Sequence, residues 1–308
     1  MVGCSMTTLP RTDFAHVLAR CRTVRRYEDL AAAFYQQSAT FRLAGVGASA
    51  PVGIGAHIRR SFLGALGAGA SDAARAGEPC SWDPPSALDI FCREQLRGPR
   101  GDGLPKPYVV ECAIDQGDLI VTLRVFGMAN DWFMTAAEAM AAGIRTILPW
   151  GRLYPGRKSA PHILSRDISV DVLRPFPINV RVVRLVFTSP TDTGCSDPRV
   201  EPHRILTRLQ RRVDGISRWN GVGLADEAGG ALAGQMKGYS FNASGLQTGH
   251  HQSPNARGQV RRKDTMTGAL LITGDIAKIW PLLAMGEKCH LGRGAVEGLG
   301  AFRLESEG

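Results

Sequence analysis

The feature that most constrains the fold is an order of elements that the sequence predicts twice. Apolar alternation and helical periodicity predict a strand, a helix, two strands, a helix and a last strand in the first half. The expected ranges are 36–43, 52–66, 107–113, 118–126, 131–147 and 168–173. The second half repeats this order over residues 180–188, 201–219, 232–241, 266–274, 275–285 and 299–304. The sequence therefore predicts an α+β protein with two tandem ferredoxin-like (RRM-like) units.

Interruptions of this pattern suggest the domain boundaries. Two prolines in Pro175-Phe176-Pro177 are incompatible with a helix interior, and we place the linker between the two units there. We expect residues 1–35 to form an N-terminal helical extension, residues 36–175 the first unit and residues 178–308 the second. Within the extension, the pattern predicts a single helix from residue 12 to residue 26 or beyond.

The composition indicates a basic globular protein. Hydrophobic residues make up 44%, and 37 basic against 28 acidic residues give a net charge of +9. This charge favours an anionic partner such as nucleic acid, with a merely basic soluble protein as the alternative. The 7 cysteines show no C-x-x-C spacing, so neither a zinc site nor a disulfide framework is indicated. Without an 18-residue apolar run or a signal peptide, we expect a cytoplasmic protein with no membrane partner.

A stretch near the C-terminus, residues 285–304, combines glycines with the basic residues Lys288, Arg293 and Arg303. Glycine permits a positive φ and a close approach of the backbone. Successive backbone N–H groups in such a loop can form an anion-binding nest, which suits the phosphate of a nucleotide or of a nucleic acid. Neither the Walker nor the Rossmann pattern fits, because no Ser or Thr follows the lysine and the loop leads from a helix to a strand.

The predicted helix, this loop and the last strand resemble the CRISPR-associated precursor-crRNA processing endoribonucleases of the RAMP (repeat-associated mysterious protein) superfamily. The shared pattern is GE-x-x-H-[LI]-G-[KR]-G followed by GLG-x-[FY]-x-L. The matching residues are Gly286, Glu287, His290, Leu291, Gly292, Arg293, Gly294, Gly298, Leu299, Gly300, Phe302 and Leu304. Glu297 and Ala301 depart from the family, which usually has an apolar or aromatic residue and a basic residue there. The resemblance implies two tandem ferredoxin-like RAMP domains with a C-terminal glycine-rich loop.

The resemblance also implies an activity, namely cleavage of precursor crRNA within the CRISPR repeat without a metal or another cofactor. In this chemistry the 2′-oxygen attacks the neighbouring phosphorus, which leaves a 2′,3′-cyclic phosphate and a 5′-hydroxyl. The implied partners are the stem-loop of the repeat RNA, the crRNA and other subunits of a CRISPR effector complex. Two alternatives stay open: a non-catalytic RAMP subunit that only binds crRNA, and a small-molecule enzyme that binds a nucleotide in the glycine loop.

For catalysis, the resemblance draws attention to the first helix of the first domain, where this family often carries its catalytic histidine. His57 lies there, opposite the apolar stripe of Ile54, Ile58 and Phe62. An imidazole can give or take a proton near neutral pH. Arg60 shares the face of His57 and is our candidate for stabilising the phosphorane. The alternative is an ordinary surface histidine.

Two basic segments add candidates for RNA binding. On the predicted helix 201–219, four arginines follow one another at i, i+4, i+7 and i+8, which suits a polyanion unless this is only a solvated face. Between residues 239 and 265, a polar basic segment predicts a flexible loop or hairpin that meets an RNA stem. The predicted RNA-binding residues are Arg204, Arg208, Arg211, Arg212, Arg257, Arg261, Arg262, Lys263, Lys288, His290, Gly292, Arg293, Gly294, Gly298 and Gly300.

Overall fold

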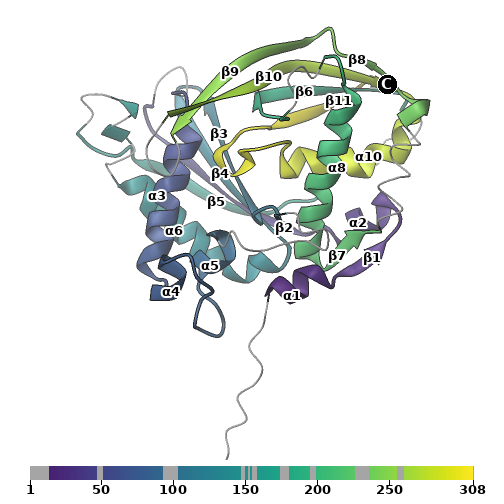
Figure 1. Ribbon diagram of the computed structural model, residues 1–308. Coiled ribbons are helices and arrows are strands. Elements are labelled where there is room, and N and C mark those ends of the chain that lie inside the picture. Colours follow the sequence, from purple (N-terminus) through teal and green to yellow (C-terminus); the bar gives the residue numbers. More distant parts are fainter. Residues whose placement is uncertain are drawn as a thin grey trace, which may run out of the picture.

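The fold is built on two main sheets, both antiparallel, each with helices packed on one face (Figure 1). The computed structural model describes residues 14–46, 51–92, 103–146, 150–151, 153–154, 158–173, 180–194, 199–225, 236–254 and 260–307. Within these residues, each sheet and its two main helices form one unit, and the units follow each other along the chain. No helix of the described part is both long and apolar enough to span a membrane.

The first unit has the sheet order β3-β4-β2-β5. Its strands are β2 (Gln36–Leu43), β3 (Tyr108–Asp115), β4 (Asp118–Phe126) and β5 (Ile163–Val170). Its main helices are α3 (Ile54–Ala68) and α6 (Phe133–Arg145). Alternate strand residues such as Phe41 and Leu123 are fully buried under these helices, because successive side chains of a strand point to opposite faces. The chain order and the sheet order together are those of the predicted ferredoxin-like unit.

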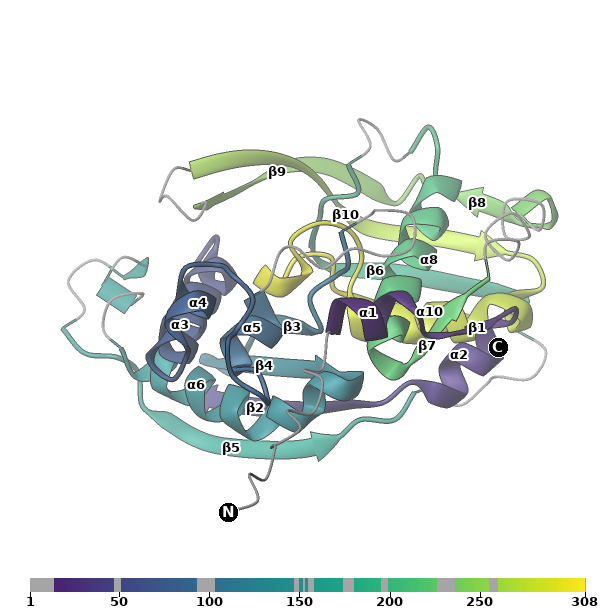
Figure 2. The same ribbon diagram turned by 60° about the horizontal axis from the view of Figure 1, so that its bottom comes forward.

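The second unit repeats this topology with the sheet order β11-β6-β10-β8, and β9 also pairs with β10. Its strands are β6 (Val182–Thr191), β8 (Ser240–Asn242), β9 (Leu246–Pro254), β10 (Val260–Thr273) and β11 (Phe302–Glu307). Its main helices are α8 (His203–Ser217) and α10 (Ile276–Cys289). Strands β9 and β10 form a long hairpin that reaches past the sheet toward α3 of the first unit (Figure 2).

Two predicted strands differ from the observed ones. In the described part of the strand predicted at residues 232–241, Met236–Gly238 form a 3-10 turn and only residues 240 and 241 belong to a strand, β8. Both β8 and β9 pair with β10. Strand β9 shows no apolar alternation, because most of its side chains before His251 are exposed. The last strand of the first unit begins at Ile163 and not at residue 168. The predicted linker at residues 175–177 lies outside the described residues.

The N-terminal extension is not the single helix that we predicted. It contains α1 (Phe14–Ala19), β1 (Arg22–Val24) and α2 (Tyr27–Ala33), and β1 pairs in parallel with β7 (Val222–Leu224). Phe14 and Leu18 are buried in the core of the first unit, whereas Val24, Tyr27 and Leu30 are buried in the core of the second. The helix is interrupted because the segment passes from one hydrophobic core to the other.

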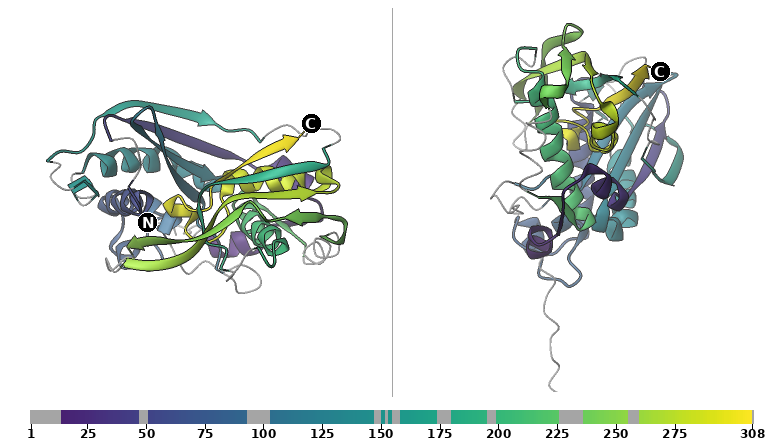
Figure 3. Two further views of the ribbon diagram at one scale, coloured as in Figure 1. Left: turned by 90° about the horizontal axis from the view of Figure 1, so that it is seen from above. Right: turned by 90° about the vertical axis from the view of Figure 1, so that its right-hand side faces the viewer.

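The C-terminal glycine stretch lies in the middle of the molecule. Figure 3 shows this yellow segment between the blue helices of the first unit and the green elements of the second. It includes the short 3-10 helix η4 (Ala295–Glu297), which contacts both α3 and β3. The loop that connects the last two elements of the second unit is therefore also a contact to the first unit.

Candidate nucleic-acid interface and catalytic site

The glycine loop runs from His290 to Ala301, between α10 and β11. Gly292, Gly294, Gly298 and Gly300 all have a positive φ, between 76° and 85°. The backbone N–H groups of residues 291, 293 and 297–300 donate to backbone carbonyls, and that of Ala301 donates to the Ser189 hydroxyl. At these positions the amides hold the loop together, so the open phosphate nest that we expected is not formed there.

Close packing fixes this loop against the first unit. A Cβ atom on Gly55, in the first turn of α3, would lie 2.0 Å from the carbonyl oxygen of Glu297. A Cβ atom on Gly298 would lie 3.0 Å from the carbonyl oxygen of Val110 on β3. Only glycine allows such an approach of two backbones. The side chain of residue 297 is thereby held next to α3.

Three chain segments meet in an ion-pair cluster at this contact. The Glu297 carboxylate lies 3.8 Å from Nη1 of Arg59 on α3 and 3.5 Å from Nζ of Lys263 on β10. Nε of Arg59 also donates to the Tyr108 hydroxyl at 3.0 Å. His251 pairs with Lys263 across the hairpin and is 9% exposed. Burial lowers the pKa of His251, Lys263 acts in the same direction, and Glu297 opposes both. Sequence analysis missed Arg59, which no motif distinguishes from its neighbours on the helix.

The predicted catalytic residues His57 and Arg60 lie on α3, and both are partly exposed. The side that contacts the loop is defined by Gly55 and Arg59. At about 100° per residue, His57 is about 160° around the helix axis from either of them. The structure therefore brings Arg59 to the loop, while His57 and Arg60 lie on other sides of the helix, away from that contact.

The basic row predicted on α8 is exposed in part. Three of its members reach solvent, namely Arg204, Arg208 and Arg211. Arg204 pairs with Glu201 at 2.9 Å, so the row does have an acidic neighbour. Arg212 points inward instead: its Nε donates to the carbonyl of Cys289 at 3.1 Å, and burial lowers its pKa. In this arrangement Arg212 holds the end of α10 and is not part of the exposed row.

The basic segment between residues 239 and 265 was predicted to be a flexible loop or a hairpin, and it contributes to the β9–β10 hairpin. Arg261, Arg262 and Lys263 lie on β10, and the side chain of Arg262 is exposed. Arg257 lies outside the described residues. His250 is exposed, with Nδ1 2.9 Å from Asp264, whereas the neighbouring His251 is buried. Within the described residues no group of three or more His, Cys, Asp or Glu side chains is placed to hold a metal ion.

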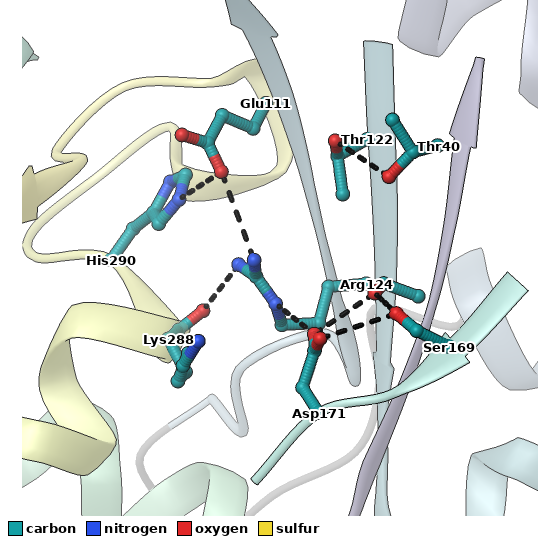
Figure 4. A network of polar contacts seen from close by, with 9 residues as sticks. Thr40, Glu111, Thr122, Arg124, Ser169, Asp171, Lys288 and His290 are labelled. Atoms are coloured by element: carbon teal, nitrogen blue, oxygen red, sulfur yellow. Dashed lines mark hydrogen bonds and ion pairs between the residues drawn. The ribbon is translucent and has the colours of Figure 1, made fainter. Parts of the chain in front are cut away.

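A partly buried polar network lies beneath the loop (Figure 4). Arg124 of β4 donates from Nε to Asp171 at 3.2 Å and from Nη1 to the carbonyl of Lys288 at 3.2 Å. Its Nη2 lies 3.8 Å from Glu111 of β3. His290 lies on the other side of Glu111, with Nε2 3.9 Å from Oε2. The network joins the first sheet to the C-terminal end of α10.

His290 is inside this network and is only 1% exposed. Burial lowers its pKa, although Glu111 opposes this effect. The contact with His290, together with Arg124 and Lys288, lowers the pKa of Glu111 to about 2 against the effect of burial. The ring of His290 is therefore not available to an RNA phosphate in this arrangement, contrary to our prediction. Arg293, by contrast, is 71% exposed on the loop surface.

Comparison with known proteins identifies a similar family. Residues 185–302 match the sequence model of the CRISPR-associated endoribonuclease Cas6. This segment begins in β6 and ends with the first residue of β11, so it includes α8, the hairpin, α10 and the glycine loop. The match confirms the resemblance to CRISPR-associated RAMP endoribonucleases that the loop motif indicated. No curated protein matches the chain.

Solved Cas6 structures share the fold over nearly the whole chain. A Cas6 (TTHB231) product complex has a TM-score of 0.56 at 14% identity, covering 89% of this chain and 99% of that chain. A Cas6 (TTHA0078) product complex has a TM-score of 0.51 at 16% identity, covering 88% and 100%. Thermus thermophilus Cas6 (TTHB231) has a TM-score of 0.50 at 12% identity, covering 88% and 99%. At these identities the structures establish the fold alone, and they confirm the predicted tandem ferredoxin-like fold.

Proposed function

We propose that this protein is an endoribonuclease that cleaves precursor crRNA within the CRISPR repeat. The observation that carries the proposal is the match of residues 185–302 to the Cas6 endoribonuclease model. The fold supports it, because a Cas6 product complex aligns with 89% of the chain. The net charge of +9 suits an RNA substrate.

The proposed reaction is a transesterification that needs no metal ion. The 2′-oxygen next to the scissile bond forms a bond to phosphorus, and the bond from phosphorus to the 5′-oxygen breaks. A base takes the proton of the 2′-hydroxyl, an acid protonates the leaving 5′-oxygen, and cations stabilise the phosphorane. The products are a 2′,3′-cyclic phosphate and a 5′-hydroxyl.

We assign the proton transfer to His57 and the charge stabilisation to Arg60. His57 lies near the start of α3 and is partly exposed, so RNA can reach it. An imidazole suits both proton steps near neutral pH. Arg60 lies three residues further on the same helix, about 60° around the axis from His57.

RNA binding is assigned to exposed and partly exposed cations on three elements. They are Arg204, Arg208 and Arg211 on α8, Arg262 and Lys263 on the hairpin, and Arg293 on the glycine loop. Duplex RNA is recognised mainly through its shape, its phosphates and its 2′-hydroxyls, so arginine and lysine side chains are suited to a repeat stem-loop. Other subunits of a CRISPR effector complex are further partners in this proposal.

Single-turnover cleavage of the cognate repeat RNA in EDTA tests the proposal. We expect wild-type protein to cut the repeat, to leave a 2′,3′-cyclic phosphate, and to spare an RNA with a single 2′-deoxy substitution at the scissile nucleotide. The variant His57→Ala should bind within a few-fold of wild type but cut about 100-fold more slowly, as expected for a lost acid or base. His203→Ala, which removes an exposed histidine at the start of α8, is the matched control and should cut at the wild-type rate.

Two outcomes would redirect the assignment. Tight binding of the repeat by wild-type protein without any cleavage would contradict the enzymatic role and support a non-catalytic crRNA-binding subunit. Full-rate cleavage by His57→Ala would remove His57 from the reaction and leave the endoribonuclease activity in place.

A further inference from the structure

Glu297 occupies an unusual position, because its carboxylate lies between cations of two other elements, α3 and β10. Its backbone is fixed by Gly55 on one side and by its own N–H bond to the carbonyl of Gly294 at 2.7 Å. The side chain therefore has to extend into the space between α3 and the β9–β10 hairpin. It is 19% exposed, so the carboxylate is only partly withdrawn from solvent.

The two cations that face Glu297 are also accessible in part. The side chain of Arg59 is 24% exposed and that of Lys263 is 25% exposed. The nitrogen–oxygen distances of 3.8 Å and 3.5 Å exceed the 2.7–2.9 Å that is usual for charge-assisted hydrogen bonds. Glu297 thus neutralises both cations at a distance without binding either of them tightly.

The geometry points to Glu297 as an internal counterion that holds the place of an RNA phosphate. On this proposal, RNA displaces the carboxylate from Lys263 and Arg59 when it binds. The affinity of the protein for RNA is therefore lower than it would be if these two cations had no carboxylate beside them. The inference rests on the proposed RNA-binding function and assigns a regulatory role to a residue of the same site.

Four features favour displacement over a fixed structural bridge. Arg59 is oriented independently by the Tyr108 hydroxyl, so its position does not require Glu297. Lys263 is held on β10 by backbone pairing with His251. A phosphate placed between the two cations would lie close to the carboxylate, and two like charges at such a distance repel each other. The glutamate side chain can rotate away while its backbone remains packed on Gly55.

Electrostatics make the consequence measurable. With Glu297 ionised, the cluster of Arg59, Lys263 and Glu297 carries a net charge of +1, and with glutamine at position 297 it carries +2. The extra cation is then available to neutralise one more phosphate. Each neutralised phosphate steepens the dependence of log affinity on log salt by about 0.7 for single strands and about 0.9 for duplexes.

The test compares Glu297→Gln with Glu305→Gln. Glu305 on β11 also lies between two arginines, at 2.9 Å from Arg303 and 3.9 Å from Arg184, but it does not belong to the cluster at α3. Both variants raise the net charge by one. Binding is measured by fluorescence anisotropy with an uncleavable repeat RNA that carries a 2′-deoxy substitution, over a series of salt concentrations.

We expect Glu297→Gln to bind the repeat RNA about fivefold more tightly at low salt and to steepen the salt slope by about 0.7–0.9. Glu305→Gln should change neither quantity by a comparable amount. The gain should be smaller when Lys263→Ala is combined with Glu297→Gln, because Arg59 is then the only one of the two cations that the glutamine variant can release. Glu297→Asp, which keeps the charge but draws it away from both cations, should show a smaller gain.

Three results would overturn the inference: unchanged or weaker binding by Glu297→Gln, equal gains for the two glutamine variants, or the same gain in the Lys263→Ala background. Melting curves show whether each variant is folded. If Glu297→Gln does not fold, Glu297→Asp takes its place in the comparison with Glu305→Gln. The result is independent of cleavage, so a protein that binds but does not cut the repeat can still support the role of Glu297 while it contradicts the proposed activity.

Discussion

The buried guanidinium of Arg124 is the sharpest test of what holds the glycine loop to the first unit. Its side chain is 11% exposed and contacts Asp171, Glu111 and the carbonyl of Lys288. The first of these partners follows β5, the second lies on β3, and the third lies in the last turn of α10. The substitution Arg124→Met keeps the length of the side chain and removes all three polar contacts.

The expected cost follows from burial. Removing one partner of a buried ion pair typically costs 3–5 kcal/mol, because the other charge stays buried without compensation. Asp171 keeps its bonds from the hydroxyls of Ser38 at 2.9 Å and Ser169 at 3.3 Å, so the lower end applies. We therefore expect the free energy of unfolding to fall by about 3 kcal/mol and Tm to fall by about 5–10 °C.

Arg42 provides a matched control on the neighbouring strand. It contacts Asp118 at 2.7 Å and Asp115 at 2.9 Å, which are shorter distances than those of Arg124, but its side chain is 31% exposed. Ion pairs that water can reach contribute little to stability. Arg42→Met should therefore destabilise the protein much less than Arg124→Met, although it breaks the shorter contacts.

Urea denaturation of both variants, followed by fluorescence and circular dichroism, measures the two free energies. The reasoning would be refuted if Arg42→Met cost as much as Arg124→Met, or if Arg124→Met left stability unchanged. Arg124→Lys is a useful third variant, because it keeps the charge but loses the planar fork that reaches three partners, and we expect an intermediate loss.

Two further predictions concern charge. Burial lowers the pKa of His290, so the unfolded chain takes up a proton near pH 6.5 that the folded protein does not accept, and stability falls as the pH drops from 7 to 5.5. The stability of His290→Asn should fall less over this range, which lies above the titration of Glu111. The free energy of unfolding is measured by urea denaturation at each pH. If it depends on pH equally in wild type and variant, a buried neutral His290 is contradicted. The double variant Arg208→Glu and Arg211→Glu should melt like wild type but flatten the salt slope of RNA binding by about 0.7–0.9 per lost phosphate contact. An unchanged slope in anisotropy titrations would show that this part of α8 is only a solvated face.

The order of elements could be predicted because burial on one face leaves a periodic signal. Strands β2 and β4 alternate between buried residues such as Phe41 and Val121 and partly exposed ones such as Thr40 and Thr122. The turn between β3 and β4 lies at Gln116 and Gly117, and both residues take a positive φ, as a two-residue turn of this kind requires. Two such patterns in tandem were sufficient for the ferredoxin-like fold.

Where the position of a residue depends on polar contacts, the sequence carried no such signal. Strand β9 is largely polar and exposed, so its pairing with β10 depends on backbone hydrogen bonds that leave no apolar alternation. Arg212 was predicted as one of four RNA-binding arginines on a basic helix, yet its Nε donates to a backbone carbonyl of α10, and His290 was predicted to bind RNA, yet it is only 1% exposed. Their partners, the carbonyl of Cys289 and the carboxylate of Glu111, are 77 and 179 residues away along the chain.

The glycines show most clearly how one sequence pattern can serve two purposes. Their spacing suggested a phosphate nest, but a Cβ on Gly300 would lie 1.8 Å from the carbonyl oxygen of Leu291, and one on Gly292 would lie 2.2 Å from that of Asp192. These glycines are therefore required for the loop to fold against its own neighbours. The close packing also sets the place of Glu297 opposite Arg59 and Lys263. The loop amides are used inside the loop. At this junction an RNA backbone would therefore meet the charged side chains that the loop positions.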